Sequence, residues 1–215
     1  MAEALRIDMC SGAELEAALP ALARLRMTVF RAWPYLYDGS EDYERGYLRT
    51  YVESPGAAVA VAWDGGEPVG ASTCLPMPEA DEEARAPFAA RGLDLSRWFY
   101  FGESVLLPAY RGRGIGVRFF ELREAAACAH AGVAYAAFCA VQRPADHPSR
   151  PKDAVGLEAF WTHRGYTRRP DFCAWFSWRD VGEAEETRKP LIFWMKSLHG
   201  EPLPAEAAPA DGVAA

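Results

Sequence analysis

A glycine-rich turn is the part of this sequence best suited to chemistry on a charged ligand. It follows an apolar run, Phe99–Leu107, and leads into an amphipathic run, Val117–Ala131. The first run is typical of a strand and the second of a helix. The turn residues are Arg111, Gly112, Arg113, Gly114, Ile115 and Gly116. A turn here presents unpaired N–H groups at a helix start, and its glycines let a ligand approach closely. The sequence therefore predicts a phosphate-binding turn.

The order of the glycines narrows the kind of phosphate ligand. A nucleotide P-loop needs a lysine after its last glycine, and a dinucleotide fingerprint needs a third glycine where Val117 stands. The pattern present is Arg-x-x-Gly-x-Gly, at Arg111, Gly114 and Gly116. It resembles the acetyl-CoA pyrophosphate loop of the GNAT superfamily of N-acetyltransferases. The alternative is a glycine-rich surface turn whose arginines face water.

A second stretch, Phe160–Tyr166, carries the same resemblance. It has an aromatic pair, then Gly165 and another aromatic residue, and so resembles the second GNAT signature on the last helix of the domain. The resemblance implies acetyl-CoA as cosubstrate, with its pyrophosphate on the backbone amides of residues 113–116 and Trp161 beside it. It also implies that the pantetheine arm pairs with the backbone of Val105, Leu106 and Leu107.

Glu103 is the candidate general base. A carboxylate inside an apolar strand is costly without a purpose, and a base must reach the amine directly or through one water. GNAT enzymes often carry a glutamate on this strand. Strand alternation places Phe101, Glu103 and Val105 on one face of the sheet. The open alternative is a glutamate that faces solvent or pairs with an arginine.

The general acid is where this chain departs from the GNAT pattern. Many GNAT enzymes have a tyrosine at the position of Trp161, and an indole N–H cannot usefully supply a proton. Tyr166, at the end of the same helix, is the candidate in its place, with Tyr110 as a second choice. Alternatively, no strong acid is needed, because a thiol pKa near ~8.5 already makes a fair leaving group.

The segment after the first predicted helix is aromatic and then acidic. Its candidate substrate residues are Trp33, Tyr35, Asp38 and Glu41. Aromatic faces together with carboxylates suit a cationic amine. The alternative is an aromatic core face beneath a loop, which three tyrosines at helical spacing, Tyr43, Tyr47 and Tyr51, fit equally well.

Composition excludes several classes of protein. The chain has 215 residues, half of them hydrophobic, and a net charge of −7, which argues against nucleic acid or an anionic membrane as partner. Five scattered cysteines favour reduced thiols, and none lies at zinc-ligand spacing, so no metal is expected. The N-terminal residues lack a signal-peptide pattern. We therefore expect a cytoplasmic protein.

The order of predicted elements is strand, two helices, three strands, helix, strand, helix and two strands. Together with both motifs, it resembles the GNAT layout over about residues 4–198. The fold class expected is α+β, with a mixed, mostly antiparallel sheet of about seven strands flanked by about four helices. We expect a single domain over 1–198 and a mobile Pro/Ala-rich tail over 199–215.

The function implied is acetyl transfer from acetyl-CoA to a primary amine of a small molecule, by direct attack on the thioester. Two alternatives stay open at this point: a non-catalytic acyl-CoA-binding or sensing domain, and an acetyltransferase acting on protein or peptide amines. A homodimer through the apolar stretch Leu191–Met195 is possible, although core strand is the simpler interpretation of these residues.

Overall fold

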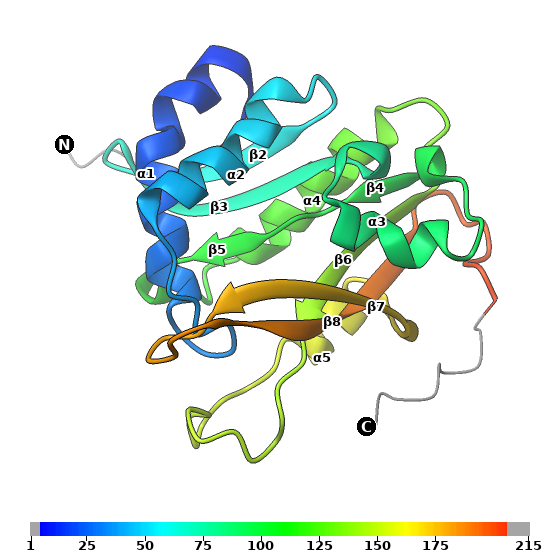
Figure 1. The fold of residues 1–215 in the computed structure, drawn as a ribbon. Helices are drawn as coiled ribbons and strands as arrows, with labels where there is room; N and C mark the ends of the chain where they lie inside the picture. Colours follow the sequence, from blue (N-terminus) through cyan, green and yellow to red (C-terminus); the bar gives the residue numbers. More distant parts are fainter. Residues whose placement is uncertain (1–4, 206–215) are drawn as a thin grey trace.

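A mostly antiparallel sheet forms the middle layer of the molecule, and helices cover both of its faces (Figure 1). The computed structural model describes residues 5–205. Seven strands lie in the order β1-β2-β3-β4-β6-β8-β7, and an eighth, β5, pairs with β3. The strands are β1 (Arg6–Cys10), β2 (Ala58–Asp64), β3 (Glu67–Pro76), β4 (Trp98–Tyr100), β5 (Ser104–Leu106), β6 (Tyr135–Val141), β7 (Thr167–Arg179) and β8 (Glu186–Ser197). The predicted fold class is confirmed.

Five α-helices lie within the described residues. They are α1 (Gly12–Phe30), α2 (Glu41–Glu53), α3 (Glu82–Ala89), α4 (Ile115–Cys128) and α5 (Glu158–His163). β2 packs against helices on both faces of the sheet. Its Val59 and Val61 pack in the core cluster that contains α1 and α2, while Ala60 and Ala62 pack with Phe119 of α4. Side chains alternate between the faces, as strand geometry requires.

The predicted strand over 99–107 is interrupted in its middle. β3 pairs with β4 through Leu75 and Tyr100, and with β5 through Ser72 and Ser104. Thr73 and Cys74 of β3 therefore lie opposite three residues, 101–103, which connect β4 to β5. This extra residue is a β-bulge, which bends the strand and redirects side chains.

The bulge corrects one prediction about the faces of this strand. Phe101 does not share a face with Glu103 and Val105. It packs with Phe120 of α4, whereas Glu103 forms an ion pair with Arg26 of α1 on the opposite face. The simple period of two fails here because the bulge adds one residue between the two side chains.

The segment after β8 lies against the body of the protein. The Tyr135 hydroxyl donates to the carbonyl of Pro202 (3.1 Å), and the Arg169 guanidinium donates to the carbonyls of Pro204 (2.8 Å) and Ala205 (3.2 Å). The rest of the predicted tail, 206–215, lies outside the described residues. Leu191–Met195 belong to β8, between β6 and β7, and are buried in the core. The homodimer stays a prediction.

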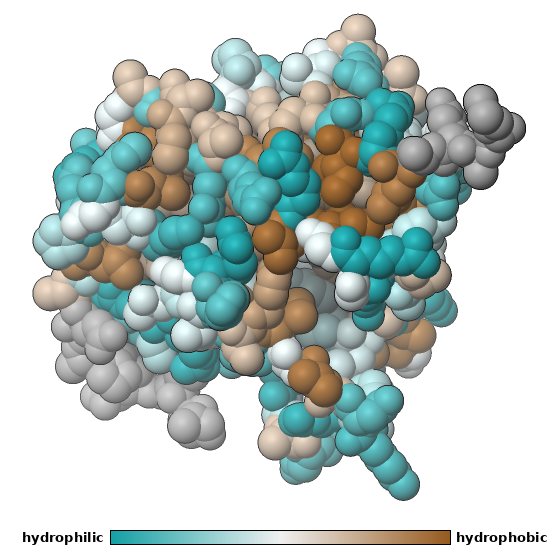
Figure 2. Space-filling model, turned by 180° about the vertical axis from the view of Figure 1, so that it is seen from behind, coloured by the Kyte–Doolittle hydropathy of each residue, from teal (hydrophilic) through white to brown (hydrophobic). Residues whose placement is uncertain are grey.

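Seen from behind, the surface carries both hydrophilic and hydrophobic groups, and the hydrophobic groups gather in a patch toward the upper right (Figure 2). The large apolar side chains that are exposed, among them Leu5, Val155 and Trp175, come from separate segments of the chain. None of the helices in residues 5–205 is long and apolar enough to cross a membrane.

Candidate functional site

The predicted phosphate-binding turn joins β5 to α4. Gly112 and Gly114 adopt left-handed backbone conformations, with φ of 74° and 80°. Gly114 is the N-cap of α4, so no side chain caps the first turn, and that turn carries no acidic residue. Residues 111–114 are exposed to solvent. The N–H groups at this helix start are therefore open to an anion, and the helix dipole favours one.

The two arginines of the turn have different surroundings. Arg111 Nε donates to the carbonyl of Leu106 (3.3 Å), which ties the turn back to β5. The Arg113 guanidinium lies over the ring of Tyr110, 5.1 Å from its centroid. Both side chains are exposed. Arg111 therefore helps to position the turn, while both arginines keep positive charge beside the helix start.

The start of α4 is fixed against the rest of the molecule. Ile115 is buried, with 2% of its surface exposed. A Cβ at Gly116 would lie 3.6 Å from the ring of Phe160 on α5. The two helices thus meet at the phosphate-binding turn, which explains why the two sequence motifs occur together.

A free strand edge leads from the bulge toward this turn. The Leu107 N–H donates to the carbonyl of Val69 (2.9 Å), and by the alternation of an antiparallel ladder Val105 also directs its backbone groups to β3. The backbone groups of Ser104 and Leu106 therefore point away from β3. Of the three residues predicted to pair with pantetheine, Leu106 has its groups on the free edge, and Val105 and Leu107 do not.

The sheet opens beside that edge. β4 and β6 run parallel up to Tyr100 and Ala137, and the N–H of Phe101 still donates to the carbonyl of Ala137 (2.8 Å). Beyond this point β6 pairs with β8, and β5 pairs with β3 alone. The two strands diverge visibly (Figure 1). An extended ligand can therefore lie along β5 as an added strand would.

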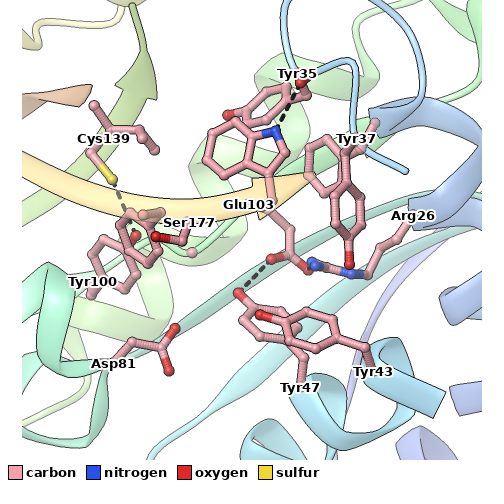
Figure 3. Close-up of a pocket in the computed structure, with 15 residues that line it drawn as sticks. Arg26, Tyr35, Tyr37, Tyr43, Tyr47, Asp81, Tyr100, Glu103, Cys139 and Ser177 are labelled. Carbon is pink, nitrogen blue, oxygen red and sulfur yellow. Dashed lines mark hydrogen bonds and ion pairs between the residues drawn. The ribbon is translucent and has the colours of Figure 1, made fainter. Parts of the chain in front are cut away.

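A cavity of about 130 Å³ opens on the α1 and α2 side of the bulge (Figure 3). Cavities of about 150 Å³ accept a benzene-sized molecule, so this one suits a single small ring or a short chain. Most of its wall is aromatic. The aromatic residues are Phe30, Tyr35, Tyr37, Tyr43, Tyr47, Tyr100, Phe176 and Trp178.

Glu103 projects from the bulge into this cavity. Its carboxylate pairs with Arg26 and accepts a hydrogen bond from the Tyr47 hydroxyl (2.7 Å), and its side chain is 8% exposed. The Tyr47 hydroxyl also bonds to that of Tyr51 (2.9 Å). The backbone N–H of Glu103 donates to Thr73 Oγ1 (3.0 Å). The side chain is thus fixed from both ends.

Arg26 holds two carboxylates rather than one. It pairs with Glu44 of α2 as well as with Glu103, and Glu44 is fully buried. Burial alone lowers the pKa of Arg26, but the carboxylates of Glu103 and Glu44 raise it well above its ordinary value. One positive charge therefore faces two negative charges, and the buried cluster has a net charge of −1.

A comparison with known protein families identifies the chain. Residues 22–166, more than half of the sequence, match the model of the acetyltransferase (GNAT) family. The chain belongs to the GNAT acetyltransferase family. It is accordingly an acyl-CoA-dependent acyltransferase, and its cosubstrate is acetyl-CoA. A search among curated proteins found no match in sequence.

Solved GNAT structures share the fold. The putative acetyltransferase yncA from Salmonella typhimurium, determined with acetyl-CoA, has a TM-score of 0.58 and 12% identity over 95% of this chain and 100% of its own. An N-acetyltransferase from Staphylococcus aureus Mu50 has a TM-score of 0.56 and 14% identity over 91% and 99%. The loading GNATL domain of CurA from Lyngbya majuscula has a TM-score of 0.56 and 11% identity, over 93% of this chain and 100% of its own. At such identities the likeness concerns the fold.

The turn and the free edge fit the acetyl-CoA of a GNAT enzyme. The open helix start with its two arginines suits a pyrophosphate, and the diverging strands leave room for an extended arm. Trp161 of α5 packs 5.2 Å from the ring of Phe138 on β6 and 5.1 Å from Trp194. Within residues 5–205, no group of three or more His, Cys, Asp or Glu is placed to hold a metal ion.

Tyr166 does not meet Glu103 in this GNAT fold. It is 2% exposed, and its hydroxyl donates to Glu124 Oε1 (3.1 Å), which also pairs with Lys196. Its ring packs in the cluster with Phe138, whereas Glu103 faces the other core cluster. Burial and the neighbouring Glu124 raise the pKa of Tyr166 well above its ordinary value. This hydroxyl is committed to a structural contact and is a poor proton donor.

The predicted substrate acids lie apart from the pocket. Asp38 pairs with Arg31 (2.8 Å) and Arg179 (2.8 Å), and Glu41 pairs with Arg45 one helical turn on (3.0 Å). Neither acid lines the cavity. Neighbouring arginines balance the charges of both acids. The expectation that Asp38 and Glu41 attract the amine therefore does not fit the structure.

The predicted aromatic residues divide differently. Tyr35 lines the cavity, and its ring packs 6.0 Å from that of Trp178. Trp33 lies outside the lining and packs against His147, 5.2 Å between ring centroids. Of the three tyrosines at helical spacing, Tyr43 and Tyr47 line the cavity, and Tyr51 lies in the core cluster.

Sequence reasoning missed Arg26, Glu44 and Asp81. A signal for the first two was present: Arg26 follows Leu22 by four residues on the buried stripe of α1, and Glu44 precedes Leu48 by four on that of α2. A charged residue at a core position needs a buried partner. Nothing in the pattern around Asp81 indicates that it borders the pocket.

Proposed function

We propose that this GNAT enzyme is an N-acetyltransferase that acetylates the primary amine of a small molecule bound in the aromatic pocket. The observation that carries the proposal is the position of Glu103. It lies on the bulge between the aromatic pocket and the free edge of β5, so it adjoins both the predicted acceptor and the predicted thioester.

The pocket supports a small molecule rather than a protein acceptor. Its walls come from α1, α2, β4, β6, β7 and β8, and it has room for about one ring-sized group. Aromatic walls bury an apolar substrate body, and the net negative charge of the Arg26 cluster attracts a protonated amine.

Glu103 has the geometry of a base that acts directly or through one water. Arg26 forms an ion pair with it, and the Tyr47 hydroxyl orients one carboxylate oxygen. Burial, with Glu103 close by, raises the pKa of Tyr47 well above its ordinary value, so the hydroxyl stays a hydrogen-bond donor. Remaining lone pairs on the carboxylate are available to accept a proton.

The reaction is direct transfer. Acetyl-CoA supplies the activated acetyl group. The bound ammonium group first gives one proton to Glu103, directly or through one water. The neutral amine nitrogen then forms the new C–N bond as the C–S bond breaks, the sulfur leaves as the CoA thiolate, and the second proton lost by the nitrogen passes through solvent to that thiolate. The Leu106 N–H, on the free edge, is the candidate donor to the carbonyl oxygen. No side chain has to act as a strong acid, because a thiolate is a fair leaving group.

The test measures release of the CoA thiol from acetyl-CoA with a panel of small primary amines. The variant Glu103→Gln should lower kcat/KM by about 10²–10⁴-fold with no change in the affinity for CoA. Glu41→Gln, an exposed acid outside the cavity, is the matched control and should behave as wild type. Both variants are checked by thermal melting.

Two results would overturn parts of this proposal. If acetyl-CoA binds and no amine releases thiol, the protein is a binding or sensing domain. If Glu103→Gln keeps full activity in a folded protein, Glu103 is not the base.

A further inference from the structure

Asp81 stands at the N-cap of α3 but does not cap the helix. No hydrogen bond joins its side chain to the first turn. Its carboxylate is directed into the pocket, between Tyr100 and Tyr47 (Figure 3). Within residues 5–205 the carboxylate of Asp81 has neither a hydrogen bond nor an ion pair. Arg85, one helical turn on, donates instead to the carbonyl of Pro78 (3.5 Å). Asp81 is therefore a solvent-exposed acid at the edge of the pocket, and its carboxylate forms no ion pair.

A second, much smaller cavity borders the same carboxylate. It measures about 10 Å³ and shares Tyr47, Tyr100 and Asp81 with the large pocket, while Tyr51 closes another side. This volume is roughly that of one water, and an ammonium group is of similar size. A carboxylate beside several aromatic rings is the usual composition of a site for an organic cation.

The hydroxyls of these three tyrosines are already engaged. The hydroxyls of Tyr47 and Tyr51 bond to each other, that of Tyr47 also donates to Glu103, and the Tyr100 hydroxyl contacts the Cys139 thiol (3.3 Å). The tyrosines therefore present mainly their rings to the space near Asp81, and Asp81 provides its charge.

The pocket contains more negative charge than one amine can balance. The Arg26 cluster, with Glu44 and Glu103, has a net charge of −1, and Asp81 adds a second negative charge. A protonated monoamine supplies one positive charge. We propose that the acceptor is a diamine-type molecule, with its reacting nitrogen at Glu103 and a second cationic group at Asp81, so that Asp81 determines specificity. This inference rests on the proposed N-acetyltransferase function.

The experiment compares matched acceptors. Short linear diamines are each assayed beside the monoamine of equal chain length, and a xylylenediamine beside 4-methylbenzylamine, with thiol release as the readout. In the wild type, the diamine should have the higher kcat/KM. Asp81→Asn should lower kcat/KM for the diamine by about two- to fivefold, because Asp81 is exposed to solvent, and should lower kcat/KM for the monoamine by clearly less.

Two further measurements distinguish a binding role from a structural one. Glu82→Gln removes an exposed acid of the same helix that lines neither cavity, and should leave the preference for the diamine intact. Added salt should reduce the preference in the wild type and have little effect in Asp81→Asn. Thermal melting of each variant verifies its fold.

The outcomes separate this inference from the proposed function. If no amine is acetylated, the proposed function fails. If monoamines and diamines are acetylated equally well, or if Asp81→Asn impairs both to the same degree, the enzyme is an N-acetyltransferase and the role of Asp81 is overturned.

Discussion

The β-bulge predicts that a single methyl group at Gly102 will disturb both stability and catalysis. A Cβ at this position would overlap the hydroxyl of Tyr51 and lie 2.6 Å from Thr73 Oγ1. Both atoms belong to the network that fixes Glu103, and Tyr51 is only 4% exposed. Backbone bonds to β3 on either side of the bulge prevent the strand from moving away.

The size of the effect follows from these contacts. Overpacking costs about 1–3 kcal/mol, and loss of the Tyr51–Tyr47 hydrogen bond adds about 1 kcal/mol. Gly102→Ala should therefore destabilise the protein by about 2–4 kcal/mol, which for a domain of this length lowers the Tm by about 5–15 °C. Displacement of Glu103 should lower kcat by about 10–100-fold.

Thermal melting and thiol release measure the two effects, with Gly46→Ala as control. Gly46 is exposed in α2 with open space at its Cβ, so alanine there should be neutral or stabilising by up to ~1 kcal/mol. Tyr51→Phe removes the overlapping oxygen and should restore part of the stability lost in Gly102→Ala. If Gly102→Ala melts with the wild type, or if Tyr51→Phe brings no recovery, the reasoning about the bulge is refuted.

Two further predictions concern charge and thiols. Burial tends to raise the pKa of Asp180, but hydrogen bonds from Arg143 and Lys189 bring this pKa below its ordinary value of 3.8. The ionised carboxylate therefore stabilises the folded protein at neutral pH, and this stabilisation is lost as the pH falls through the lowered pKa. Asp180→Asn should cost about 3–5 kcal/mol at pH 7 and progressively less below about pH 4, as measured by urea unfolding; an equal loss at both pH values would contradict the assignment. Burial also raises the pKa of the Cys139 thiol to about 12, whereas Cys128 is exposed. At about pH 8 a thiol reagent should therefore label Cys128 rapidly and Cys139 only after unfolding, and Cys128→Ser should remove the rapid phase.

Most of the fold was predictable because its signals are local. The buried stripe of α1 recurs every three or four residues, and β6 is wholly apolar, as expected for a strand covered on both faces. The signal for the predicted phosphate-binding turn was also local, since its glycines, arginines and flanking elements are consecutive in the sequence. The bulge was not predictable, because its register depends on where β3 pairs on each side.

The proposed acceptor pocket was predictable only in part. Glu103 and Tyr35 stood out by residue type, and both line the cavity. Asp38 also stood out, but its charge is neutralised by Arg179, which is 141 residues away in the sequence. No local pattern around Asp81 indicated that it borders the cavity. Such long-range ion pairs decide which acids face a cavity. The spacing of apolar residues along the sequence carries no information about these pairs.

The place of β8 in the sheet has a consequence for how the protein is made. Among the strands of residues 5–205, β8 is the last to leave the ribosome, yet it lies between β6 and β7, which are synthesised earlier. Until it arrives, the inner edge of β6 has no permanent neighbour, and its apolar side chains are open to incorrect pairing. The nascent chain can assemble α1 to α4 around the first strands, but closure of the sheet must wait until translation has passed Ser197.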